Sequence, residues 1–108
     1  MSSKEQNEYI LEKFRECIPI FEVMSDVVRQ NIIVLLAENE EGLNVNSITE
    51  VLPLSRPAVS HHLKILKQSG ILGYRKKGTE NYYYLTLKNP VEKLKEVIKL
   101  IEINCDLR

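Results

Sequence analysis

The sequence lacks the long apolar runs and cysteine clusters that mark membrane proteins and disulfide-rich domains. Its longest apolar runs, such as residues 32–37, are far shorter than the roughly 20 residues that span a bilayer. The first eight residues are polar and partly acidic, so they lack the apolar core of a signal peptide. The two cysteines, at positions 17 and 105, form neither a disulfide framework nor a CxxC motif. We therefore expect a cytoplasmic protein with no membrane segment.

No low-complexity tract, internal repeat or linker divides the sequence. Its 108 residues match the length of about one domain, and an apolar content of 44% suffices for one core. These features predict a single domain over residues 1–108. A chain of this size buries only roughly 60–70% of its unfolded surface, so a dimer interface would be a natural further source of stability.

The sequence also lacks net charge, but its charges are unevenly distributed. Residues 1–52 hold four basic and ten acidic side chains, a balance of −6. Residues 53–89 hold seven basic side chains against Glu80 alone, a balance of +6. A polyanion responds to the local field of the surface that faces it. The basic segment therefore favours nucleic acid as a partner, despite the neutral total.

Apolar periodicity and end signals predict a mainly helical chain with one β-hairpin. In chain order we expect helices over 5–18, 26–41, 47–52 and 55–69, strands over 71–76 and 82–87, and a helix over 90–107. Ser25 or Asp26, Ser55 and Asn89 can cap helices, and Ser47–Glu50 fits a capping box. Pro19 interrupts the first helix. This order, α/α/α/α/β/β/α, is that of a winged helix-turn-helix, with the helix-turn-helix at 47–69 and the wing at 71–87.

The helix over 55–69 has the two faces that a recognition helix needs. Val59, Leu63 and Leu66 form a buried stripe, and a polar face lies opposite. The major groove is about 12 Å wide and admits such a helix. We expect base contacts from Arg56, Ser60 and His61. We expect phosphate contacts from Lys64 and from the basic residues of the wing, which we call the wing cations: Arg75, Lys76 and Lys77. The complete predicted DNA-binding set is Ser55, Arg56, Ser60, His61, Lys64, Arg75, Lys76 and Lys77.

Residues 20–87 resemble the ArsR/SmtB family of bacterial metal- and stress-responsive repressors. The resemblance is strongest over Ser60–Leu72, which follows the pattern Ser-x-His-Leu-x-x-Leu-x-x-x-Gly-Leu-(Leu/Val), with Ile71 in place of the leucine after glycine. Residues 24–29, 32–36 and 54–59 and the basic wing also match. The flanking helices match in position and length, and the resemblance covers about two thirds of the chain.

The resemblance implies a homodimeric repressor that occupies a palindromic operator on double-stranded DNA until an effector lowers its affinity. It also implies that the first and last helices form the dimer interface. The apolar residues that this assigns to the interface are Ile10, Phe14, Cys17, Leu94, Val97, Ile98 and Ile101.

Neither a metal site nor an active site is indicated. Metal-sensing relatives carry cysteines on the third helix or Asp and His ligands on the last, whereas residues 47–54 contain no cysteine and residues 90–107 no histidine. His61 and His62 project about 100° apart on a helix, which disfavours binding of one ion. Ser60 and His61 do not face each other as a nucleophile and its base would. We expect no cofactor and no enzymatic activity.

Two alternatives stay open beside the repressor. We expect Cys17 and Cys105 to be small apolar interface residues. The first alternative is that they approach each other where the first and last helices pack and form a redox-sensitive thiol pair. Some relatives sense redox state with a cysteine pair, but their first cysteine lies further along the chain than Cys17. The second alternative is a protein–protein interaction module that keeps only the winged-helix shape.

Overall fold

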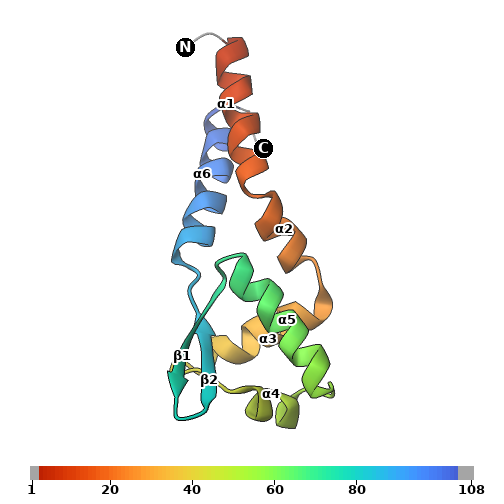
Figure 1. Cartoon of the computed structure of the whole chain (residues 1–108). Helices are drawn as coiled ribbons and strands as arrows, with labels where there is room; N and C mark the ends of the chain where they lie inside the picture. The colour runs from red at the N-terminus through yellow and green to blue at the C-terminus, as the bar shows by residue number, and fades with distance from the viewer. Residues whose placement is uncertain (1–2, 105–108) are drawn as a thin grey trace.

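The computed structural model describes residues 3–104, which form six helices and one antiparallel hairpin (Figure 1). The elements in chain order are α1 (Ser3–Glu16), α2 (Ile18–Met24), α3 (Val27–Ala37), α4 (Val45–Val51), α5 (Arg56–Gln68), β1 (Leu72–Lys77), β2 (Glu80–Leu85) and α6 (Lys88–Asn104). The mainly helical fold with a hairpin is confirmed. No helix within residues 3–104 has the length and apolar character to cross a membrane.

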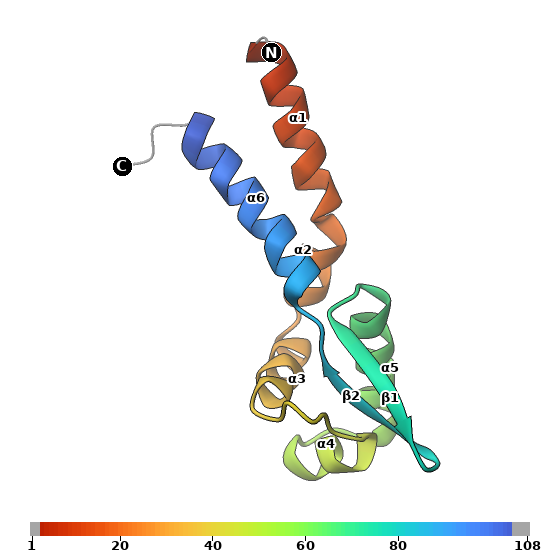
Figure 2. The same ribbon diagram turned by 90° about the vertical axis from the view of Figure 1, so that its left-hand side faces the viewer.

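The molecule is elongated, with extents of 55 × 25 × 21 Å. We call α1 and α6 the arm and call α3, α4, α5 and the hairpin the head; α2 joins the two parts (Figures 1 and 2). In both views the start of α5, α4 and the hairpin tip lie at the end of the head farthest from the arm. The arm therefore lies at the opposite end of the molecule from the start of α5 and the hairpin tip.

The core of the protein lies in the head. The predicted stripe of α5 is buried, with Val59, Leu63 and Leu66 each at most 1% exposed. It packs in one cluster whose other fully or nearly fully buried members are Val23, Ile32, Leu36, Ile48, Ile71 and Leu72. Burial at this spacing fixes which face of α5 points outward.

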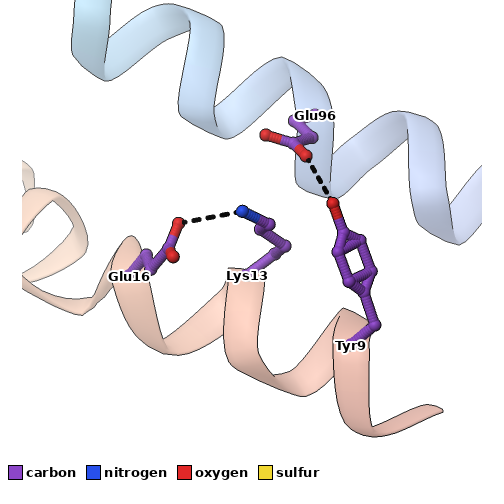
Figure 3. A network of polar contacts seen from close by, with 4 residues as sticks. All are labelled: Tyr9, Lys13, Glu16 and Glu96. Carbon is purple, nitrogen blue, oxygen red and sulfur yellow. Dashed lines mark hydrogen bonds and ion pairs between the residues drawn. The ribbon is translucent and has the colours of Figure 1, made fainter. Parts of the chain in front are cut away.

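The arm is held by a smaller set of contacts. The Tyr9 hydroxyl donates to Glu96 Oε1 at 3.2 Å, which links α1 to α6 (Figure 3). Lys13 Nζ lies 3.6 Å from Glu16 Oε2 one turn along α1. The carboxylates of Glu16 and Glu96, the larger effect being that of Glu16, raise the pKa of Lys13 above its usual value. The packing of α1 against α6 is therefore stabilised in part by polar contacts, whereas the head is stabilised by its apolar core.

The hairpin is paired from Leu72↔Leu85 to Lys77↔Glu80 and turns at residues 78 and 79. Gly78 has φ of 66°, and glycine at this first turn position is typical of the two-residue turns that close hairpins. Leu43, which precedes α4, pairs with Tyr83 through two backbone hydrogen bonds of 3.0 and 2.9 Å. The hairpin is thus attached to the connection between α3 and α4.

The predicted helix boundaries were wrong in two places before residue 42. The sequence did not predict α2, because proline inside a helix usually ends it. Pro19 lies instead within the first turn of α2, where the backbone N–H that proline lacks would have no partner within the helix. α3 begins after the cap Asp26 as expected, but it ends at Ala37 and not at residue 41. The segment 38–41 forms a turn that leads to Gly42.

Two later helices begin earlier than the sequence suggested. α4 starts at Val45 because Asn44 is its N-cap, with Oδ1 accepting from Ser47 N at 2.8 Å. The proposed capping box at Ser47–Glu50 is therefore wrong. α6 starts at Lys88, so Asn89 lies inside the first turn and does not precede it. Ser55 is the cap of α5, as predicted.

Candidate nucleic-acid interface

The outward face of α5 carries free polar groups at the far end of the head. Ser55 Oγ accepts from Ala58 N at 3.3 Å and so fixes the start of the helix. Arg56, Ser60, His61 and Lys64 are all exposed. Within residues 3–104, the side chains of Arg56, Ser60 and Lys64 make no hydrogen bond or ion pair. They are available to an external ligand.

The three wing cations do not share one face. In a strand successive side chains point to opposite sides, so Arg75 and Lys77 lie opposite to Lys76. The Arg75 guanidinium lies 5.3 Å from the Tyr84 ring centroid, and Lys77 Nζ lies 5.7 Å from that of Tyr82. Arg75 Nη2 also donates to the Glu41 carbonyl at 2.8 Å. The Arg75 side chain is thus partly engaged by its own protein, whereas the side chains of Lys76 and Lys77 make no hydrogen bond within residues 3–104.

Lys67 is a basic residue of this surface that sequence analysis missed. Its Nζ lies 3.9 Å from the ring centroid of Tyr74, on the same side of the hairpin as Lys76. The contact joins the end of α5 to β1 through a cation–π interaction. The available signal was its spacing of three residues from Lys64, which places both lysines on neighbouring positions of the helix surface.

The two histidines have different surroundings. His61 is exposed, whereas His62 is half-buried and its Nδ1 lies 3.4 Å from Arg29 Nη1. Arg29 Nε also donates to the Val23 carbonyl at 2.9 Å, so this side chain connects α2, α3 and α5. His62 is therefore part of the internal packing of the head, and His61 belongs to the outward face. Residues 3–104 contain no group of three or more potential ligands that could hold a metal ion.

The predicted interface residues of the arm fall into two groups. Cys17 and Val97 are 0% and 3% exposed, so they are already buried within one chain. Ile98 is 54% exposed, and Ile10, Phe14, Leu94 and Ile101 are half-buried. Exposed apolar residues that were not predicted continue this surface: Leu11, Ile18, Phe21 and Ile103.

Of the two cysteines in the predicted thiol pair, Cys17 lies within the described residues. Burial raises the pKa of the Cys17 thiol, and the positive charge of Lys93 opposes this effect. A buried thiol that stays protonated is a poor nucleophile. Cys105 lies outside the described residues, so the redox pair stays a prediction.

Comparison with known proteins identifies the family. Residues 26–74 match the model of the bacterial regulatory protein ArsR family. An uncharacterised HTH-type transcriptional regulator of Methanocaldococcus jannaschii is 40% identical over 92 residues, which cover 85% of this chain and 98% of the relative. The chain belongs to the ArsR family. It is a DNA-binding transcriptional regulator, and the proteins of this family are regulators and not enzymes.

Two further relatives agree with this assignment. The transcriptional repressor SdpR of Bacillus subtilis is 36% identical over 66 residues, or 61% of this chain and 71% of the relative. An ArsR-like transcriptional regulator from Rhodococcus sp. RHA1 superposes with a TM-score of 0.76 at 25% identity, over 86% of this chain and 83% of that one. The ArsR-family fold therefore extends beyond residues 26–74 to most of this chain.

Proposed function

We propose that this ArsR-family regulator is a homodimeric repressor that binds a palindromic operator through α5 and the wing. The observation that carries the proposal is the outward face of α5, whose Arg56, Ser60 and Lys64 side chains are exposed and unbonded within residues 3–104. A recognition helix presents such groups to base edges while its opposite face is buried in its own domain. SdpR, a relative, is named a transcriptional repressor.

The proposed contacts divide by chemistry. Arg56, Ser60 and His61 contact base edges, which carry the sequence information. Lys64, Arg75, Lys76 and Lys77 contact phosphates, which fix the register of the protein on DNA. Ser55, as the cap of α5, sets the direction of the helix start. Because Arg75 already donates to the Glu41 carbonyl, it contributes less to phosphate binding than Lys76 or Lys77.

The arm supports the proposed homodimer. Leu11, Ile98 and Ile103 are 48%, 54% and 68% exposed, a pattern that a partner surface would cover. A groove lined by Asn7, Ile10, Leu11, Phe14, Ile101 and Asn104 lies between α1 and α6. The two helices diverge away from the head in Figure 2. We propose that two arms pack together and hold the two heads apart.

The chain acts in the cytoplasm as a single winged-helix domain, by binding and not by catalysis. An effector releases the operator by lowering the affinity of the dimer for DNA. A thiol switch would require Cys17, which is buried, to react with Cys105.

Selection from random duplex DNA tests the proposal. The purified chain should enrich a palindromic sequence, and its affinity for that duplex should exceed its affinity for a scrambled duplex by about 10³-fold or more. Across a salt series, Lys77→Ala should weaken binding to both duplexes and reduce the salt slope by about one unit. Binding that is weak and without sequence preference even at low salt would instead support the protein–protein interaction module.

A further inference from the structure

Glu80 is the only acidic residue in the basic segment 53–89, and it lies at the tip of the wing. Its Oε2 accepts a hydrogen bond of 2.7 Å from Asn44 Nδ2, at the start of α4. Both side chains are half-buried. A short hydrogen bond to an ionised carboxylate is stronger than one between neutral groups. The carboxylate is therefore held by the protein and is not simply an unfavourable charge beside DNA.

The Asn44 amide makes two hydrogen bonds at once. Its Oδ1 caps α4 by accepting from Ser47 N, and its Nδ2 donates to Glu80. The cap fixes the orientation of the amide, so the nitrogen can only point toward the wing tip. One side chain thus ties the start of the helix-turn-helix to the end of the hairpin.

The hairpin is also attached farther from its tip, so the contact at the tip is an additional, separate anchor. In the middle of the hairpin, Leu43 and Tyr83 pair through their backbones, and Arg75 donates to the Glu41 carbonyl. Gly42, with φ of 92°, allows the close approach there, because a Cβ at this position would lie 2.7 Å from the Tyr83 carbonyl oxygen. A hairpin anchored only at residues 75 and 83 could still bend beyond them, toward its tip. The Asn44–Glu80 bond holds the tip itself.

A polar notch of about 200 Å³ separates the wing tip from the start of α5. Arg56 lines it from α5, Asn46 from α4, and Thr79, Glu80 and Asn81 from the hairpin. The width of this notch sets the spacing between the proposed base contact of Arg56 and the wing cations. Anything that moves the tip changes that spacing.

We propose that Glu80 is a positioning residue for operator recognition, which acts through Asn44 to hold the wing at a fixed distance from Arg56. The inference rests on the proposed function. Operator binding requires the contacts of α5 and of the wing to form together in one geometry, whereas electrostatic binding to random DNA tolerates a mobile wing. The Asn44–Glu80 bond should therefore increase discrimination between sequences more than it increases general DNA affinity.

Four variants separate positioning from charge and from helix capping. Asn44→Ser keeps a good cap for α4 but loses the donor to Glu80. Glu80→Ala loses the acceptor, and Glu80→Gln removes the charge but keeps an acceptor oxygen. The fourth variant combines Asn44→Ser with Glu80→Ala. The probes are the duplex selected by the wild-type chain and a scrambled duplex of equal composition, and thermal unfolding checks that each variant is folded.

The measured quantity is the ratio of the two affinities. Asn44→Ser and Glu80→Ala should each lower the ratio by roughly three- to tenfold, the range given by the net free energy of one hydrogen bond. The double variant should be no worse than either single one, because both remove the same interaction. Glu80→Gln should tighten binding to both duplexes while the ratio stays unchanged.

Two results would overturn the inference: a ratio that is unchanged in both Asn44→Ser and Glu80→Ala, or effects of the two substitutions that add. These results differ from failure of the proposed function, in which the wild-type chain selects no sequence at all. Glu80 lies in the hairpin and outside the apolar core, so Glu80→Ala should stay folded. It therefore tests the inference even if Asn44→Ser unfolds α4.

Discussion

The head and the arm bury their apolar residues to very different degrees. In the head, eight residues form one cluster together with Val23 of α2, and each is at most 7% exposed. In the arm, α1 has no buried residue, and α6 buries Pro90 and Val97 alone among its residues. The head therefore has a core of its own, whereas the arm keeps an apolar surface that a single chain does not cover.

The difference indicates a division of labour. The cationic and hydrogen-bonding groups that suit DNA lie on the head, where a packed core holds α5 in place. Exposed apolar groups lie on both parts, such as Val27, Val34 and Val51 on the head, but those of the arm, Leu11, Ile98 and Ile103, lie on helices with few buried residues. A substitution in the head should thus act on folding or on DNA contacts, and one in the arm should act on the association of two chains.

The largest effect should come from the core of the head. Leu63→Ala removes a side chain that is 1% exposed and leaves a cavity, so it should lower the free energy of unfolding by about 2–5 kcal/mol. Urea unfolding followed by circular dichroism measures this loss. Ile98→Ala, in the arm, should cost far less at a concentration where the chain is monomeric. Equal losses for the two variants would contradict the contrast.

A charge on the arm should have the next largest effect, on assembly. Ile98→Glu places a carboxylate in the proposed apolar interface, and burying an unpaired charge is costly, so dimerisation should weaken by roughly a hundredfold. Sedimentation equilibrium measures the dissociation constant. Val34→Glu is the matched control, because Val34 is 59% exposed but lies on α3 of the head. The account fails here if the control dissociates the dimer as strongly as Ile98→Glu.

The effect of removing a base contact should be smaller still and should be confined to DNA binding. Arg56→Ala should weaken binding to the selected duplex by about 1–3 kcal/mol and relax the preference at one base position. Arg15→Ala, which removes an exposed cation from the arm, should leave the preference at every position intact. Repeated selection with each variant provides the measurement. A uniform loss on all sequences would show that Arg56 contacts phosphate and not a base.

The smallest effect concerns the junction between α2 and the head. A hydrogen bond from Arg29 N, and then the positive charge of Arg29, hold the pKa of Asp26 below its usual value, despite some desolvation. A lowered pKa in the folded state adds stability above a pH of about 4. This contribution is lost as the pH falls through the lowered value.

Asp26→Asn keeps a capping oxygen but does not titrate. The difference in urea midpoint between wild type and this variant should therefore shrink as the pH falls from about 7 to about 3. Parallel midpoints over the whole range would show that the Asp26 carboxylate does not contribute.

Local rules predicted the recognition helix well because its signals are local. The stripe Val59, Leu63 and Leu66 follows from helix periodicity, and the Ser55 cap from the chemistry of helix starts. α2 was missed because the same residue type, proline, either breaks a helix or opens one, and its position decides which. The start of α4 was misplaced because Asn44 and Ser47 are both suitable caps.

The wing was predicted less completely because its contacts join distant parts of the chain. The donation from Arg75 to the Glu41 carbonyl and the bond between Asn44 and Glu80 span more than thirty residues. No local pattern indicates them. The opposite orientations of Arg75 and Lys76, in contrast, follow from the alternation of side chains along a strand, which the sequence alone allows one to apply.

Protection of guanine N7 atoms on the selected duplex tests the central claim most directly, namely that one arm pair presents two copies of α5 to successive major grooves. The account predicts two protected major-groove segments on one side of the duplex, with centres one helical turn or about 10–10.5 base pairs apart. A single protected segment, or two segments on opposite sides of the duplex, would contradict it.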